Sequence, residues 1–121
     1  NIKIRNQNHK IFLNHLRGDI FFKDFKIKGA SNYGLHLILR KKNSSLFKKI
    51  LKILDRNLIE YRLGSLGNQI RQPYLRKFKK KSYLRSLKNT EHMHFYSVYI
   101  GNHQALDKNR IIKLCNNLDK I

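Results

Sequence analysis

The side chains with the clearest chemistry form a basic stretch, residues 69–86, which reads QIRQPYLRKFKKKSYLRS and contains no Asp or Glu. Lysine and arginine bind phosphate oxygens, and aromatic rings stack on nucleic-acid bases. Because like charges repel, a polyanion orders such a run best. The alternatives are a solvated basic loop and, for the rings, packing against protein. The residues that we expect to contact RNA are Arg71, Tyr74, Arg76, Lys77, Phe78, Lys79, Lys80, Lys81, Tyr83, Arg85 and Lys88.

Three histidines, His92, His94 and His103, lie close together in the chain. If residues 92 and 94 belong to a strand, their side chains share one face of it. Metal sites and metal-dependent nucleases use such spacing. Only Glu91 and Asp107 lie nearby as acids, so hydrogen bonding of the histidines to phosphate is favoured over metal binding. We therefore expect no metal site and no catalytic residue. A small RNA-processing nuclease or another RNA-binding factor built on residues 92–103 is the alternative function.

The remaining motifs point to no bound cofactor. The Gly64 and Gly67 pair lacks the Gly-Lys-Ser/Thr sequence of a phosphate-binding loop. Cys115 falls on the apolar stripe of an amphipathic segment, where a core position is favoured over a nucleophile. As the single cysteine, it has no partner for an internal disulfide, which indicates a reducing compartment.

The composition limits the classes of partner. The chain has 121 residues, with 27 Lys and Arg against 7 Asp and Glu, and a formal net charge of +20. Such an imbalance destabilises the folded monomer through self-repulsion, and it favours a polyanionic partner. Nucleic acid is the first choice. A peripheral membrane protein with residues 11–27 as its anchor is another alternative. No apolar run approaches the roughly 20 residues of a membrane span.

The residue types also carry a signal about the genome. The chain is rich in Lys, Ile and Asn, whose codons are rich in A and T, and it contains one proline and few alanines. This bias is typical of an organellar genome, usually mitochondrial, or of a very A/T-rich organism, and we expect a mitochondrial protein of the matrix.

Hydrophobic periodicity predicts the elements that position these residues. Leu35–Arg40 and residues 59–72 alternate as strands, and a third strand includes Tyr83 and Leu84 and resumes at 94–101. Residues 45–58 and 105–118 have the spacing of amphipathic helices. The lysines on the first helix form a solvated face or a second RNA-facing surface. The predicted core is Leu35, Leu37, Leu39, Phe47, Ile50, Leu54, Leu58, Ile111, Cys115 and Leu118.

This order predicts an α+β fold of the ferredoxin-like βαββα(β) type with a long basic β-hairpin. We expect residues 1–34 to be an N-terminal extension, in which residues 1–6 show a weak strand pattern. Residues 35–121 are the ferredoxin-like domain, with the hairpin tip near 69–86. The chain lacks the fourth strand of this fold. We expect Phe25–Lys28 to pair with strand 35–40 in its place.

From Leu35 to Leu118 the sequence resembles the small-subunit ribosomal protein ten family, in its LHLILR strand, its single Pro73 before a basic tip, and its YLRS return strand (residues 83–86). It departs from the family at Leu87-Lys88, where Pro-His would be expected. The resemblance implies a non-enzymatic structural component of the small ribosomal subunit head that binds ribosomal RNA through its hairpin. It implies neighbouring ribosomal proteins as partners, a location in the mitochondrial ribosome and no homo-oligomer.

Overall fold

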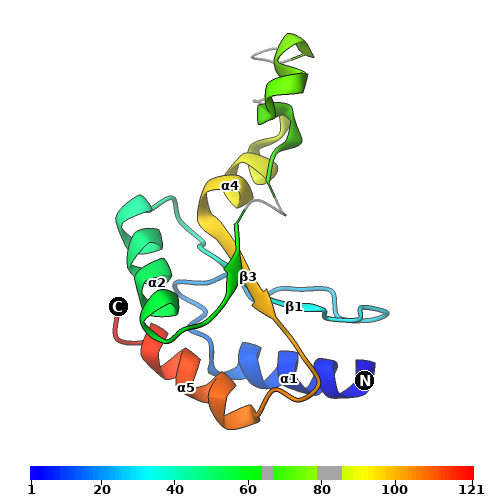
Figure 1. The fold of residues 1–121 in the computed structure, drawn as a ribbon, viewed down its shortest axis with the longest axis vertical. Helices are drawn as coiled ribbons and strands as arrows, with labels where there is room; N and C mark the ends of the chain where they lie inside the picture. The colour runs from blue at the N-terminus through cyan, green and yellow to red at the C-terminus, as the bar shows by residue number, and fades with distance from the viewer. Residues whose placement is uncertain (64–66, 79–85) are drawn as a thin grey trace.

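The structure is a computed structural model of the chain, and it describes residues 1–63, 67–78 and 86–121. These residues form a three-stranded antiparallel sheet with helices packed around it (Figure 1), so the predicted α+β class is confirmed. The elements in chain order are α1 (Ile2–His15), β1 (Gly34–Ile38), α2 (Ser44–Arg56), β2 (Tyr61–Arg62), the 3-10 helices η1 (Gln69–Arg71) and η2 (Pro73–Phe78), α4 (Lys88–Tyr96), β3 (Ser97–Gly101) and α5 (Lys108–Leu118).

The sheet has the order β1–β3–β2, and both of its strand pairs are antiparallel. Leu35 lies opposite Ile100 and Leu37 lies opposite Val98. Because side chains alternate along a strand, these four project from one face. They join the apolar faces of α1, α2 and α5 in a single core. Its buried members are Phe12, Leu13, Leu16, Phe21, Leu35, Leu37, Leu39, Ile50, Leu54, Val98, Ile100, Ile111, Leu114, Cys115 and Leu118.

Helix α2 begins and ends with regular capping motifs. The Asn43 side chain accepts a hydrogen bond from the Leu46 amide at 2.9 Å, which satisfies a donor that the first turn leaves unpaired. At the other end, the amide of Ile59 donates to the carbonyl of Leu54, and the amide of Leu58 donates to the carbonyl of Asp55. Leu58 adopts a left-handed φ of 53°. This is a Schellman motif with leucine at the position where glycine is usual.

This motif explains an error in the predicted core. Leu58 is 95% exposed, because the left-handed turn points its side chain away from the stripe formed by Ile50 and Leu54. Phe47 packs against the core but is only partly buried. The other predicted core residues are buried, as expected.

The N-terminal residues are helical and packed. The predicted strand at residues 1–6 is wrong, because α1 begins at Ile2. Phe12, Leu16 and Phe21 are almost fully buried in the core shared with β1 and α5. None of the helices in the described part of the chain is both long enough and apolar enough to cross a membrane.

The open edge of β1 is covered by residues 20–22. The Phe22 amide donates to the Ile38 carbonyl at 2.8 Å, and the Arg40 amide donates to the Ile20 carbonyl at 2.9 Å. The predicted pairing with the segment before β1 is therefore confirmed at Phe22 alone. Residues 25–28 do not pair as predicted, and the ring of Phe25 contacts the rings of His9 on α1 and His36 on β1.

The predicted long β-hairpin is wrong where the chain is described. Ladder pairing of the second strand ends after Tyr61 and Arg62. Residues 69–78 form 3-10 helices instead, because the Asn68 side chain accepts from the Ile70 amide and caps the first turn. Residues 88–96 form α4 rather than a turn and a strand. In Figure 1, α4 and the two 3-10 helices project together from one end of the sheet.

Candidate functional site

The described residues among those predicted to contact RNA lie on this projection. Tyr74 and Lys88 are exposed, and Lys77 is exposed on η2. Arg76 and Phe78 are described only as part of the η2 backbone. The predicted residues that lie outside the described part of the chain are Lys79, Lys80, Lys81, Tyr83 and Arg85.

Arg71 is held by a carboxylate of the same chain. Its Nε donates to Glu91 Oε1 at 2.8 Å, and its Nη2 donates to Glu91 Oε2. The Asn68 side chain donates to Glu91 Oε1 at 2.6 Å, and the Arg71 guanidinium lies 4.6 Å from the centre of the Phe95 ring. The Arg71 hydrogen bond, followed by that of Asn68, lowers the pKa of Glu91 to about 2. The pair neutralises itself and fixes η1 on α4.

The three histidines are not brought together as a site. They lie on α4 and on the turn after β3, and helical geometry separates residues two apart. His94 Nδ1 accepts from the Asn68 amide, His103 Nδ1 accepts from the Ala105 amide, and the His92 ring meets the Leu39 carbonyl. No group of three potential metal ligands occurs among the described residues.

A hollow of about 780 Å³ lies beside α4. Phe22, Ile38 and Met93 contribute apolar surface, and Lys42 and Lys88 contribute ammonium groups. Arg40 also borders it, with its guanidinium directed to the carbonyls of Gly18 and Phe21 and to the Asp24 carboxylate at 3.6 Å.

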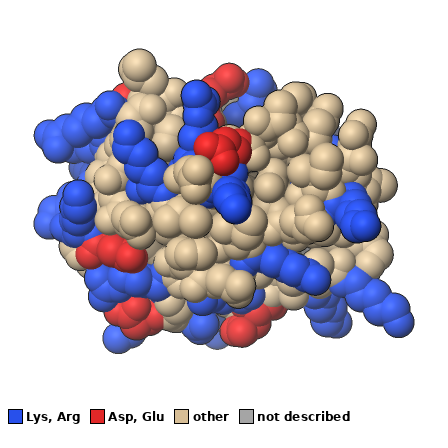
Figure 2. All heavy atoms as spheres, turned by 90° about the horizontal axis from the view of Figure 1, so that it is seen from below, with Lys and Arg blue, Asp and Glu red and all other residues tan. Residues whose placement is uncertain are grey.

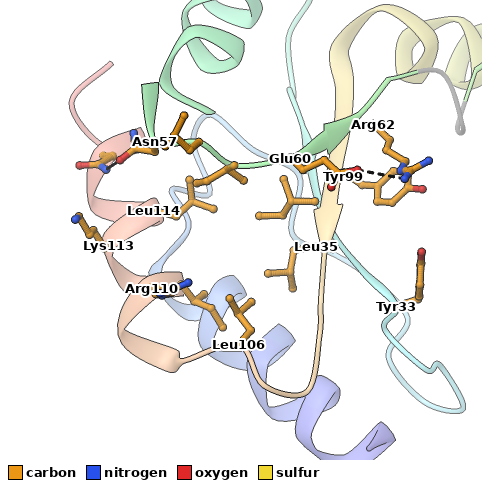
Figure 3. A pocket seen from close by; sticks show the side chains of 16 residues that line it. Tyr33, Leu35, Asn57, Glu60, Arg62, Tyr99, Leu106, Arg110, Lys113 and Leu114 are labelled. Carbon is orange, nitrogen blue, oxygen red and sulfur yellow. Dashed lines mark hydrogen bonds and ion pairs between the residues drawn. The ribbon is translucent and has the colours of Figure 1, made fainter. Parts of the chain in front are cut away.

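A second hollow, of about 760 Å³, lies between the sheet and α5 (Figure 3). Leu35 and Leu114 lie between its two sides. In Figure 3, Arg110 and Lys113 lie on α5, whereas Tyr33 and Tyr99 lie beyond β3. Tyr99 pairs with His36 and projects from the face of the sheet opposite to Leu35 and Ile100. The sequence analysis missed this site. The three-residue spacing of Arg110 and Lys113 was a signal for the cations, but local sequence does not show that α5 lies beside the sheet.

The cations do not form one continuous basic surface on the face opposite the α4 projection. Figure 2 shows lysine and arginine side chains spread over this face, with acidic side chains and wide uncharged areas between them.

Comparison with solved structures identifies the fold. The chain is similar to GDP-4-keto-6-deoxymannose-3-dehydratase with a trapped PLP-glutamate geminal diamine, with 23% identity and a TM-score of 0.73. It is also similar to the E. coli GDP-4-keto-6-deoxy-D-mannose-3-dehydratase with bound hydrated PLP, with 21% identity and a TM-score of 0.73. Each match covers 97% of this chain but only 31% and 30% of the enzymes. The chain thus spans about a third of their length. No family model and no curated protein matches the sequence.

These matches overturn the ribosomal interpretation. The resemblance to small-subunit ribosomal protein ten is wrong, because the fold is shared with PLP-dependent dehydratases. The hairpin that supported the resemblance is helical at residues 69–78. The expected role in the ribosome, the partners ribosomal RNA and ribosomal proteins, and the expectation that the chain is not enzymatic fall with it. The nuclease alternative has no support either, because the histidines do not converge.

Proposed function

We propose that this chain is one domain of an enzyme that acts on a nucleotide-linked sugar, of the same general kind as the PLP-dependent dehydratases whose fold it shares. The observation that carries the proposal is the extent of the match. It takes in almost all of this chain and about a third of each enzyme. A fold that forms about a third of one enzyme is well suited to form the corresponding domain of another enzyme.

The residues of this chain do not fit a PLP site. PLP enzymes usually hold the cofactor through a lysine Schiff base, with an acidic or basic partner for its pyridine nitrogen. No lysine in the described part of the chain is buried. Glu91, the acid with the most protected carboxylate among the ion pairs, has both oxygens engaged by Arg71. In our proposal the cofactor therefore belongs to another domain, and this chain contributes surfaces that pack against that domain or contact the sugar nucleotide.

The net charge supports an anionic ligand. A nucleotide-linked sugar carries a diphosphate, and a protein of net charge +20 attracts it over a distance set by the ionic strength. Both hollows have cations on their borders.

The strand order supports a more specific description of the fold. β3 lies between β1 and β2, and α2 and α5 follow β1 and β3. A βαββαβ unit without its last strand has this arrangement. We propose that the domain is ferredoxin-like in topology, with residues 20–22 pairing at the edge of β1. A mitochondrial location stays a prediction from composition.

Reconstitution tests the proposed function. The chain would be mixed with the part of the E. coli dehydratase that the match leaves out, and complex formation would be followed by size-exclusion chromatography. We expect the two to associate. The E. coli part should show the visible absorption of PLP, and the keto-sugar should be turned over only in the mixture. The destabilised variant Leu54→Asp is the control for folding. No association by a folded chain would contradict the proposal.

A further inference from the structure

Strand β2 forms an open edge of the sheet. The strand order is β1–β3–β2, so β2 has a paired neighbour on one side, where Tyr61 and Arg62 face β3. The other outer strand, β1, is covered by residues 20–22. Among the described residues, no backbone hydrogen bond reaches the outer side of β2. An uncovered edge of this kind is a template for pairing with another strand.

The hydrogen bonds of β3 show which residue of β2 faces outward. At the end of β3, the Asn102 amide donates to the Tyr33 carbonyl at 3.0 Å. The direction of bonding alternates along an antiparallel strand, so Ile100 also directs its N–H and C=O groups to β1. Tyr61 lies opposite Ile100 on the other side and therefore forms a pair without hydrogen bonds. The N–H and C=O groups of Tyr61 consequently point away from the sheet, at its free edge.

The neighbours of Tyr61 in the chain carry opposite charges. Glu60 and Arg62 flank it, and their side chains are 83% and 66% exposed. In an antiparallel pairing of two copies centred on Tyr61, Glu60 of each copy lies opposite Arg62 of the other. Such directly opposed residues approach closely beside a hydrogen-bonded pair. Opposite charges at these positions stabilise the pairing, and like charges destabilise it.

Apolar side chains beside this edge are left in water. Leu58 is 95% exposed and Leu63 is 55% exposed. In the same pairing, Ile59 of one copy lies opposite Leu63 of the other, on the face of the sheet that carries the core. The pairing therefore removes apolar surface from water, which favours association.

We infer that two copies of this chain form a two-fold symmetric dimer through β2, in which Tyr61 exchanges both backbone hydrogen bonds with its counterpart. The two sheets then join into one continuous sheet. A second copy is a better match than an unrelated strand, because the same five residues, 59–63, supply both signs of charge and both apolar partners at corresponding positions. The inference is independent of the proposed function, since it uses only the edge of the sheet.

The net charge decides how the dimer responds to salt. Each copy carries a formal charge of +20, so the two copies repel each other at long range. Salt screens this repulsion, whereas the backbone hydrogen bonds and the apolar contacts do not depend on it. Sedimentation equilibrium of the 121-residue chain should therefore show a monomer–dimer equilibrium. Its association constant is expected to rise about fivefold or more between about 0.05 M and about 0.5 M salt.

Charge reversal tests the pairing of Glu60 with Arg62. Arg62→Glu and Glu60→Arg are each expected to weaken the dimer about tenfold or more, because like charges then face each other on both sides of the two-fold axis. An equimolar mixture of the two variants should regain the affinity of the wild type, since opposite charges meet again in the mixed dimer. Lys10→Glu, at an exposed position of α1, changes the net charge as Arg62→Glu does and should not weaken the dimer.

A backbone substitution tests the hydrogen bonds. Tyr61→Pro removes the outward N–H group and leaves the bonds between β2 and β3 in place, because proline is tolerated where its nitrogen faces solvent. It is expected to abolish the dimer. Tyr61→Val keeps the N–H group and should dimerise at least about tenfold more strongly than Tyr61→Pro. Circular dichroism reports whether each variant is folded.

Monomeric behaviour of the folded wild type at every salt concentration would overturn the inference. Equal weakening by Lys10→Glu and Arg62→Glu, or a mixture of the charge-reversed variants that stays monomeric, would place any dimer contact on another surface. The mixing experiment also decides the matter if Tyr61→Pro fails to fold. None of these results affects the proposed function, which reconstitution with the E. coli part tests separately.

Discussion

Arg71 and Glu91 come from separate segments and form a two-bonded ion pair that joins η1 to α4. Both side chains are largely shielded from solvent, with exposures of 30% and 20%. The sequence alone predicts that Arg71 binds a ligand, but in the fold Glu91 neutralises its charge. The pair also fixes η1 on α4.

Replacement of Glu91 by Gln is expected to destabilise the fold by about 1–3 kcal/mol, because Arg71 keeps its charge and loses its partner. Urea unfolding monitored by circular dichroism measures the change. Glu60→Gln is the matched control, because its pair with Arg62 is exposed and is worth at most about 1 kcal/mol. Equal effects of the two substitutions would contradict a special role for the Arg71 pair.

Acid should weaken the same contact in a defined range of pH. The pKa of Glu91 is lowered from 4.5 to about 2 in the fold, so the unfolded chain binds the proton more readily. The contribution of Glu91 is complete above pH 4.5 and is lost as the pH falls toward 2. The difference in unfolding free energy between the wild type and Glu91→Gln should shrink over this range. A constant difference would exclude the pair as its source.

A second pH effect is expected from His9 and His36, whose rings both contact the ring of Phe25. Each has a ring Nδ1 that is buried without a hydrogen-bond partner among the described residues. Burial lowers the pKa of both histidines, and the proximity of His36 lowers that of His9 further. Protonation therefore favours the unfolded chain, and stability is lost as the pH falls below the ordinary value of 6.5.

Substitution of these histidines tests the effect. His9→Leu with His36→Phe should flatten the dependence of the unfolding free energy on pH between about 7 and 5, where the wild type loses stability. His15 is exposed on α1, and His15→Gln serves as the control. If the unfolding free energy of the double variant depends on pH as that of the wild type does, other groups cause the loss of stability.

Leu58→Gly is expected to stabilise the protein by about 0.5–1 kcal/mol. A left-handed φ costs a leucine about 1–2 kcal/mol, and this exceeds the entropy that glycine loses on folding. Thermal unfolding measures the gain. The control Lys52→Gly, within α2, should instead destabilise the protein by about 1 kcal/mol. Destabilisation by Leu58→Gly would show that the side chain makes contacts despite its exposure.

Cys115 is expected to report opening of the whole core. Its side chain is fully buried, its Sγ contacts the Phe12 carbonyl at 3.8 Å, and burial raises its thiol pKa to about 12. Iodoacetamide at pH 8 should therefore alkylate it only after unfolding. Leu54→Ala, which should cost about 2–5 kcal/mol, is expected to increase the labelling rate. Rapid labelling of the stable wild type would contradict the burial.

Hydrophobic periodicity predicted the elements that pack against one another. The stripe with Ile50 and Leu54 and the stripe with Ile111 and Cys115 both lie in the core, and Leu35 and Leu37 of β1 are buried there as expected. These features repeat within one element, so they can be read from local sequence. Leu58 was misplaced because the end of a helix depends on a backbone conformation that residue spacing does not show.

Local sequence could not predict the projection. The alternation in residues 59–72 resembles a strand, but a strand needs a partner, and the ladder of β2 ends at Arg62. Contact between Asn68, Arg71 and Glu91 then stabilises helical turns against α4. The ribosomal interpretation failed for a related reason, because high positive charge identifies the sign of a partner but not its class.

By itself, therefore, the sequence determined the α+β class, the main helices, most of the core and the attraction to anions. Those properties follow from composition and from periods of two and 3.6 residues. Only the tertiary structure decided that Arg71 is neutralised and that Arg110 and Lys113 border a hollow between the sheet and α5. The register of β1 against β3 and the packing of α5 create that hollow, and these are long-range contacts that no single segment encodes.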